Sequence, residues 1–241
     1  MSKIVFFFLV FGIANSLRAQ NSVDMQGAFI RSDTLEKNIF LLFTGHDFYE
    51  GFDYVLQVLK NKTIKASFFL TGDFVRNHID LVKRIEKDGH FVGAHSDKHL
   101  LYCDWSKRDS LLHSTAEIKA DILRNLQVLE NLGISPTYFM PPYEWYNRKV
   151  VEIAWELNQT TVNFSPGTKS NADYTTPDMP NYISSKDILE SIYEYEKING
   201  MNGFHLLIHP GTNPLRKDKL YLHLDKLLNV LKEKGYNFLK F

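Results

Sequence analysis

Short apolar runs alternate with amphipathic stretches from Asn38 to the end of the chain, and this alternation restricts the fold more than any other feature of the sequence. Runs such as 65–70 (KASFFL) and 204–208 have the length and composition of buried strands. Between such runs, stretches like 52–60 repeat their apolar residues with helical spacing. Strands that take turns with helices form a parallel sheet covered by helices, so the sequence predicts an α/β fold. The predicted strands are 39–43, 65–70, 91–94, 137–140, 160–164, 204–208 and 236–239, and the predicted helices are 52–60, 78–88, 114–132, 147–157, 186–199 and 219–232.

The first twenty residues follow a different pattern. Lys3 precedes the apolar run 4–13, and small and polar residues follow as far as Gln20. This is the layout of a secretory signal peptide, and the apolar run is much shorter than the ~20 residues that a membrane-spanning helix needs. We therefore predict a signal peptide over residues 1–20 and a single domain over residues 21–241. The mature protein is expected in the periplasm or outside the cell, without stable insertion into the membrane.

The charges of the chain balance, with 28 Lys and Arg residues against 28 Asp and Glu residues. No excess charge is present to attract nucleic acid or an anionic membrane, so a neutral substrate is favoured. The chain has 241 residues, of which 44% are hydrophobic, which is enough to bury one sizeable core. Cys103 is the only cysteine, so no intramolecular disulfide can form. The sequence makes no prediction of the oligomeric state.

Two histidines, His95 and His99, follow the predicted strand 91–94. Working residues of such folds lie at the carboxyl ends of the strands, and neutral imidazole is a good ligand for zinc and related divalent ions. A catalytic metal site commonly uses three protein ligands, so a third ligand is required. The alternative, which would be safer for an isolated pair, is that both are ordinary polar loop residues. Three other predicted strand ends carry His46-Asp47, Pro141-Pro142-Tyr143-Glu144 and His209-Pro210.

These motifs occur in the same order as in the polysaccharide deacetylases (NodB-homology, carbohydrate esterase family 4), and the chain resembles that family from about Asn38 onward. The run from His95 to His99 (HSDKH) is similar to the family's His-Ser/Thr-x-x-His metal motif and is the most specific match. Residues 65–72 resemble the family's second strand. The resemblance implies a distorted (β/α) barrel of the polysaccharide deacetylase type with mainly parallel strands. It also implies a divalent metal ion, with zinc expected, and an acetylated glycan as the substrate.

Two later motifs extend the resemblance. Leu207-Ile208-His209 is similar to a Leu-x-His motif in which the histidine is the general acid and the leucine lines the acetyl pocket. Pro141-Pro142-Tyr143 resembles a proline–tyrosine motif in which the tyrosine main-chain N–H helps to hold the oxyanion. The resemblance thus implies His209 as a catalytic residue and Leu207 and Tyr143 as substrate-binding residues. Trp145 is added to the substrate-binding residues because exposed aromatic rings in loops stack on sugar faces.

The chain departs from the family pattern at its first strand. That strand usually ends in Thr-Phe-Asp-Asp-Gly, where the first aspartate is the catalytic base and the second binds the metal. The corresponding stretch 43–47 reads FTGHD, so both aspartates are absent if Phe43 sets the register. Met140 stands where an arginine normally orients the base. The absence of the base and the absence of its arginine partner are physically linked, because an arginine left without its carboxylate would be a costly, partly buried charge.

Two other carboxylates could take over these roles. We expect Asp47 to bind the metal together with His95 and His99, and Glu144 to act as the base with its pKa tuned by the pocket; the reverse assignment is also open. The alternative for Asp47 is a helix cap, and for Glu144 an exposed loop carboxylate. His46 adjoins Asp47 and could contact the metal or the substrate.

The sequence therefore predicts an exported, metal-dependent hydrolase that removes N- or O-acetyl groups from a polysaccharide or oligosaccharide. One alternative is a noncatalytic carbohydrate-binding protein that keeps the barrel but has lost the base. Another is a hydrolase that cleaves a different bond, such as an amide outside sugars. Glycine loops that cradle phosphate and nucleophile elbows are absent from the sequence, which argues against phosphoryl transfer and serine-based acyl transfer.

Overall fold

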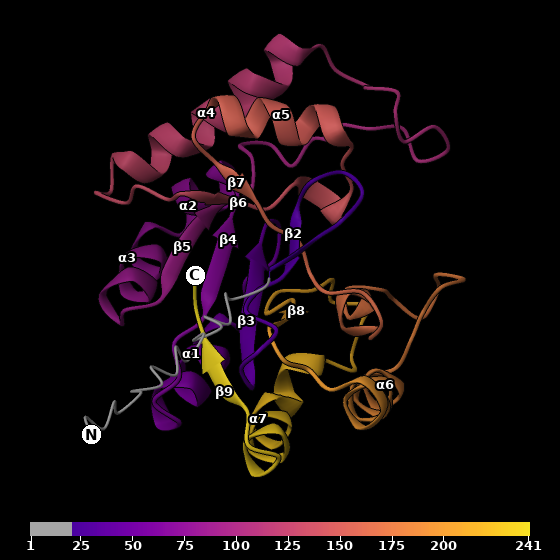
Figure 1. Ribbon diagram of the computed structural model, residues 1–241. Coiled ribbons are helices and arrows are strands. Elements are labelled where there is room, and N and C mark those ends of the chain that lie inside the picture. The colour runs from indigo at the N-terminus through magenta and orange to yellow at the C-terminus, as the bar shows by residue number, and fades with distance from the viewer. Residues whose placement is uncertain (1–20) are drawn as a thin grey trace, which may run out of the picture.

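The computed structural model describes residues 21–241, and the predicted signal peptide lies outside the described residues. The described residues form one nine-stranded sheet surrounded by helices (Figure 1). The strands are β1 (Ser22–Val23), β2 (Phe29–Arg31), β3 (Asn38–Gly45), β4 (Ser67–Leu70), β5 (Phe91–Ala94), β6 (Tyr138–Phe139), β7 (Thr160–Thr161), β8 (Phe204–Ile208) and β9 (Asn237–Leu239). The helices are α1 (Phe52–Asn61), α2 (Gly72–Asn77), α3 (Ile79–Lys87), α4 (Thr115–Glu130), α5 (Arg148–Glu156), α6 (Ser185–Asn199) and α7 (Leu224–Glu233).

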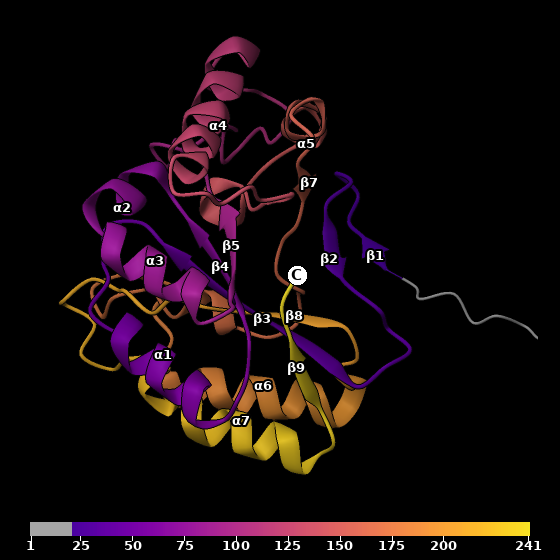
Figure 2. The ribbon, with the colours of Figure 1, turned by 90° about the vertical axis from the view of Figure 1, so that its left-hand side faces the viewer.

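The sheet is mainly parallel, and it curls until its two ends meet. Its order is β1-β2-β8-β3-β4-β5-β6-β7, with β9 also paired to β3. The pairs from β8 to β7 are parallel, whereas β1 and β2 add to the β8 edge in antiparallel fashion. An isolated bridge between Phe29 and Val162 and a 2.8 Å hydrogen bond from the Asn163 N–H to the Phe29 carbonyl join β2 to the chain after β7. The predicted distorted (β/α) barrel is confirmed (Figure 2).

The side chains of β3 alternate between two apolar clusters, as the pleat of a strand requires. Ile39, Leu41 and Phe43 belong to the larger cluster, which lies between the sheet and the helices. Phe40 and Leu42 belong to a smaller cluster inside the barrel. Each such side chain stabilises the fold by roughly 1.5–3 kcal/mol when fully buried. The same alternation directs position 44 toward the inside of the barrel and position 45 toward the helices.

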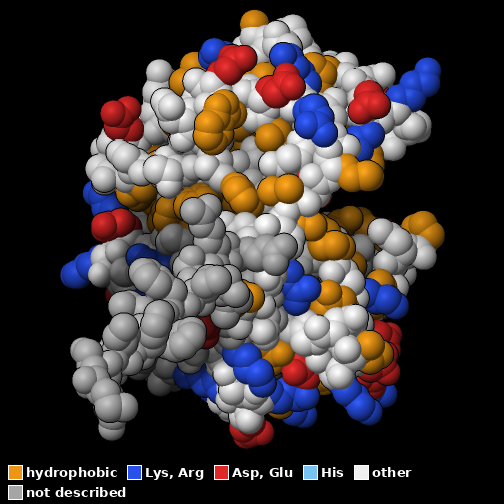
Figure 3. All heavy atoms as spheres, viewed as in Figure 1, with side chains coloured by type: hydrophobic (Ala, Val, Ile, Leu, Met, Phe, Trp, Pro, Cys, Tyr) orange, Lys and Arg blue, Asp and Glu red, His pale blue; other side chains and the backbone are white. Residues whose placement is uncertain are grey.

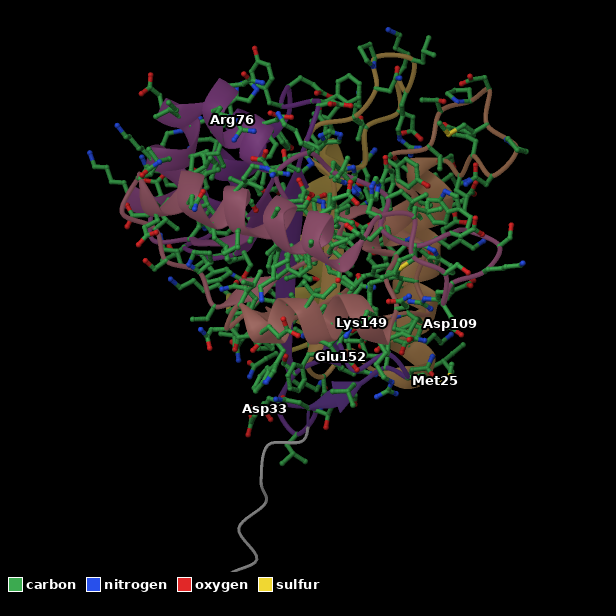
Figure 4. The ribbon with its side chains drawn as sticks, turned by 90° about the horizontal axis from the view of Figure 1, so that it is seen from above. Met25, Asp33, Arg76, Asp109, Lys149 and Glu152 are labelled. Carbon is green, nitrogen blue, oxygen red and sulfur yellow. The ribbon has the colours of Figure 1, made fainter. Side chains whose placement is uncertain are left out.

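The helices begin and end where the local sequence provides the signals. Before α4, the Ser114 hydroxyl accepts a hydrogen bond from the Glu117 N–H and the Glu117 carboxylate accepts one from the Ser114 N–H, which together form a capping box. α2 was not predicted because it is a single short helix directly after β4. The Thr71 hydroxyl caps it by accepting from the Phe74 N–H at 3.1 Å. Arg76 belongs to α2 and lies in the upper left part of Figure 4.

None of the helices in the described part of the chain is both long enough and apolar enough to cross a membrane.

Candidate active site

A cavity of about 410 Å³ opens at the carboxyl ends of β3, β5 and β8. Its wall also includes three partly exposed side chains from two loops, Trp105 from the loop before α4 and Tyr174 and Met179 from the segment before α6. In Figure 3 the right-hand outline of the molecule is indented between the part that carries α4 and α5 and the part that carries α6. The predicted site residues that line the cavity are Asp47, His95, His99, Tyr143, Glu144 and His209.

His95 is fixed at the end of β5 by hydrogen bonds on both its main chain and its ring. Its N–H donates to the Asn125 side-chain oxygen at 2.8 Å, and its Nδ1–H donates to the Met140 carbonyl at 2.8 Å. Because a carbonyl can only accept, Nδ1 carries the proton and Nε2 keeps its lone pair. Burial lowers the pKa of His95 to about 3. The ring is therefore neutral and its Nε2 lone pair is free to bind a metal ion.

The loop between the two histidines follows a contorted path that its neighbours stabilise. Ser96 and His99 both have left-handed backbone angles, with φ of 69° and 54°. The Ser96 hydroxyl accepts a hydrogen bond from the His99 N–H at 3.0 Å. Asp97 is buried and pairs with Arg76 of α2 at 2.7 Å, and Asp121 of α4 accepts from the next N–H of the loop at 3.1 Å. α2 and α4 thus hold the imidazoles in position.

A third imidazole lies against this pair. The ring of His46 stacks on that of His99 with centroids 4.1 Å apart, and the centroids of His95 and His99 are 5.0 Å apart. The Nδ1 atoms of His46 and His99 are buried and have no hydrogen-bond partner. Burial lowers the pKa of His99 well below its usual value, and the neighbouring histidines add to this effect. Burial also lowers the pKa of His46, although nearby carboxylates oppose the shift.

Asp47 lies at the rim of the same cavity. Its side chain is 67% exposed, and its Oδ1 atom lies 3.4 Å from Nδ1 of His46. Asp47 does not cap α1, since the N-cap residue of that helix is Gly51 and no side chain makes a capping hydrogen bond there.

Glu144 enters the cavity from a strained turn. Tyr143 and Glu144 are consecutive left-handed residues, with φ of 59° and 52°, directly after Pro141-Pro142. Such angles cost free energy for residues other than glycine, so the surrounding structure must hold them. One such contact is the 3.1 Å hydrogen bond from the Asn163 side chain to the Glu144 carbonyl. Burial raises the pKa of Glu144 to about 7, which gives this carboxyl group the proton affinity of a base that works at neutral pH.

His209 is paired with Asp173, an acid that sequence reasoning missed. Nδ1 of His209 lies 2.5 Å from Oδ1 of the buried Asp173, and the His209 N–H donates to Oδ2 at 2.8 Å. Burial alone would lower the pKa of His209, but the charge of Asp173 and the hydrogen bond to it outweigh burial and raise the pKa, with a further contribution from Glu144. No local motif marks Asp173; the only sequence signal is an acid within the irregular segment 165–181.

Arg216 attaches the irregular segment 165–181 to the rest of the protein. The fully buried Arg216 guanidinium donates to the Thr175 carbonyl at 2.7 Å and to the Ile183 carbonyl at 3.1 Å. Thr175 lies two residues and Ile183 ten residues beyond Asp173 in the chain. The side chains of Thr175 and Asp173 are buried, and the hydrogen bonds of Arg216 hold the stretch 175–183 that follows Asp173.

Two predicted substrate-binding residues do not line the cavity. Leu207 points into the barrel, where it packs with the apolar cluster that includes Met140. Trp145 lies behind Trp105, with ring centroids 5.4 Å apart, and Arg108 covers its other side at 4.3 Å. Trp145 therefore supports Trp105, whose ring is 57% exposed and does line the cavity.

The donor set at the cavity suits a divalent ion chemically. His95, His99 and His46 supply neutral imidazoles, and unpaired buried ring nitrogens are costly unless a partner binds them. Within residues 21–241, however, no group of three or more His, Cys, Asp or Glu side chains is already arranged to hold a metal ion. The pair His95 and His99 fits a metal site, and the third ligand must move into place.

Comparisons with known proteins identify the family of the chain. The sequence model of the polysaccharide deacetylase family matches residues 31–162. The chain is 32% identical to the uncharacterized protein YlxY of Bacillus subtilis over 188 residues, which cover 78% of this chain and half of YlxY. It is 30% identical to a peptidoglycan-N-acetylglucosamine deacetylase of Bacillus cereus over 184 residues, which cover 76% of each protein.

Solved structures show the same fold. The crystal structure of the Bc1960 peptidoglycan N-acetylglucosamine deacetylase matches with a TM-score of 0.71 at 23% identity, covering 88% of this chain and 89% of that one. A pseudoenzyme of carbohydrate esterase family 4 from Bacillus anthracis matches with a TM-score of 0.68 at 23% identity, covering 90% of this chain and 68% of that one.

Proposed function

Because the chain belongs to the polysaccharide deacetylase family, we propose that it is an exported, metal-dependent hydrolase that removes acetyl groups from a glycan. The observation that carries the proposal is the pairing of two titratable groups in one cavity. Burial raises the pKa of Glu144 to about 7, and Asp173 together with Glu144 raises that of His209. A base with a pKa near 7 and an acid whose pKa lies above its usual value suit the hydrolysis of an amide or ester.

In this scheme Glu144 is the base and His209 is the acid. The Glu144 carboxylate takes a proton from water, and the resulting hydroxide adds to the acetyl carbonyl carbon. The Tyr143 main-chain N–H stabilises the oxyanion. The His209 imidazolium then donates a proton to the departing amine or alcohol as the carbon–nitrogen or carbon–oxygen bond breaks, and acetate is released. When a divalent ion is bound by His95 and His99, it supplies polarisation of the carbonyl and activation of water.

The proposed substrate is an acetylated glycan bound along the rim. Trp105, Tyr174 and Met179 offer exposed rings and a flexible apolar side chain around the cavity, and such surfaces stack on the apolar faces of sugars. The similarity to a peptidoglycan-N-acetylglucosamine deacetylase supports an N-acetyl group on a cell-wall glycan. Export is proposed from the pattern of residues 1–20, and N-terminal sequencing of the secreted protein, with cleavage expected near Ala19, tests it.

The second candidate function is binding without catalysis. Thr44 and Gly45 stand where the family's two aspartates are expected, which removes the usual base. This reading uses the same cavity and the same aromatic rim, but it predicts no turnover.

Acetate release separates the two candidates. Protein comprising residues 21–241, loaded with zinc or cobalt, is incubated with peptidoglycan fragments, chitooligosaccharides and acetylxylan. Release that is lost in Glu144→Gln but kept in Glu152→Gln is the expected result. Glu152 is a matched control because it lies on α5 and pairs with the neighbouring Lys149 (Figure 4). Glycan binding without acetate release across the panel would favour the binding function.

A further inference from the structure

The register of β3 decides which of its residues can reach the cavity. A side chain on Gly45 would meet Leu70 at 2.7 Å and Phe52 and Phe74 at 3.1 Å, all of which are apolar core residues behind the sheet. Position 45 therefore cannot supply a metal ligand in this structure. The neighbours that face the cavity are Thr44 and His46. Of these two, only His46 has a side chain that commonly binds transition metals.

His46 already lies at the metal-binding pair. Its ring stacks on that of His99, and both rings keep a buried Nδ1 atom without a hydrogen-bond partner. Asp47, the other candidate, has a side chain that is 67% exposed and lies at the rim. The positions of the two side chains favour His46 over Asp47 as the group that completes the site, because the His46 ring already lies against His99, whereas the Asp47 carboxylate is exposed at the rim.

Oxygen acceptors stand beside two of the three rings. Nδ1–H of His95 donates to the Met140 carbonyl, and Nδ1 of His46 lies 3.4 Å from the Asp47 carboxylate. Metal-binding histidines usually donate one ring N–H to a carbonyl or carboxylate, which fixes the tautomer and presents the other nitrogen to the ion. A small approach of Asp47 toward His46 would give both rings this arrangement.

We propose that the metal ligands of this chain are His46, His95 and His99, with Asp47 as the hydrogen-bond partner of His46 rather than a ligand. The inference rests on the proposed metal-dependent function and specifies its ligand set. Three neutral imidazoles leave the full charge of the ion uncompensated, and they suit zinc, cobalt, nickel or copper better than magnesium or calcium. Because the His46 ring stacks on that of His99, it would have to rotate to present its other nitrogen to an ion bound by His95 and His99.

Metal binding itself tests the proposal, independently of catalysis. Apo-protein of residues 21–241 is titrated with zinc chloride by calorimetry and with cobalt chloride by visible absorption. His46→Ala is expected to weaken binding at least 100-fold and to change the cobalt spectrum. Asp47→Asn should keep the shape of that spectrum and lose less affinity, as expected for a residue that only supports a ligand. His78→Ala is the control, since His78 packs against Tyr49 outside the cavity.

Nitrogen chemical shifts of the imidazoles in zinc-loaded wild-type protein give a second readout that does not depend on the folding of a variant. Zinc-dependent shifts at His46, His95 and His99 together support the inference. Loss of the ion in Asp47→Asn with retention in His46→Ala, unshifted His46 nitrogens, or no uptake of either ion by wild-type protein would overturn it. Acetate release is a separate measurement. If the protein releases acetate but Asp47 proves to be the metal ligand, only this inference is refuted. If the three histidines bind the ion but no acetate is released, only the proposed hydrolase activity is refuted.

Discussion

An aspartate at position 45 of β3 should destabilise the protein far more than an aspartate at position 44. Gly45→Asp directs a carboxylate into the apolar core, where even an added β-carbon would lie only 2.7 Å from Leu70. Thr44→Asp directs it into the cavity, which Thr44 lines. The two substitutions differ by one residue in sequence, yet they place the charge on opposite faces of the sheet.

The expected magnitudes follow from these surroundings. Overpacking a core costs about 1–3 kcal/mol, and an uncompensated buried charge costs about 3–5 kcal/mol. Gly45→Asp should therefore lower the free energy of unfolding by about 4 kcal/mol or more, which moves the urea midpoint down by about 1–2 M. Gly45→Ala isolates the packing cost and should lose about 1–3 kcal/mol. Thr44→Asp should lose less than about 2 kcal/mol, because cavity water and the neighbouring imidazoles can solvate the carboxylate.

Urea unfolding followed by circular dichroism and tryptophan fluorescence measures all three variants. Equal stability of Gly45→Asp and Thr44→Asp would refute the assigned register of β3, and with it the argument that position 45 cannot bind metal. If Gly45→Ala alone accounted for the loss in Gly45→Asp, the buried-charge part of the reasoning would be wrong.

Three further outcomes are expected. Asp173→Asn should lower the pKa of His209, since burial then acts with little opposition; proton NMR titration of the His209 ring measures this, and an unchanged pKa would contradict the pairing. The raised pKa of Glu144 favours its protonated form in the folded state, so that stabilisation is lost as pH rises from 4.5 toward about 7. Glu144→Gln should therefore raise the free energy of unfolding at pH 8, by up to about 3 kcal/mol, but not at pH 4, as urea titrations at the two pH values would reveal. Trp105→Ala should weaken glycan binding by about tenfold with little change in melting temperature, whereas equal affinity by calorimetry would remove this ring from the binding surface.

Much of the fold was predictable because the apolar periodicity is strong. The predicted strands 91–94 and 204–208 match β5 and β8 at both ends, and the capping box at Ser114 marks the start of α4. The predicted strand 160–164 forms ladder pairs only over Thr160–Thr161, because pairing depends on a neighbour and not on apolar content alone. β1 and β2 were missed, since strands of two or three residues are too short for a period to emerge.

The site was predictable to the extent that its residues directly follow strands. His95, His99 and His209 could be singled out in this way, and they line one cavity. Asp173 could not, because it reaches His209 from an irregular segment whose course depends on tertiary contacts. The interpretation of Trp145 as a sugar-stacking ring stays a prediction, whereas its neighbour Trp105 is an exposed ring that does line the cavity.

Arg216 contacts none of the groups proposed to react, yet its guanidinium holds the carbonyls of Thr175 and Ile183 and so fixes the stretch that carries Asp173. A lysine at position 216 has no planar fork and could not reach both carbonyls in the same way. Sequence changes at position 216 would therefore adjust the working pH of the site, because the Arg216 charge itself lowers the pKa of His209 and its hydrogen bonds hold the stretch that follows Asp173.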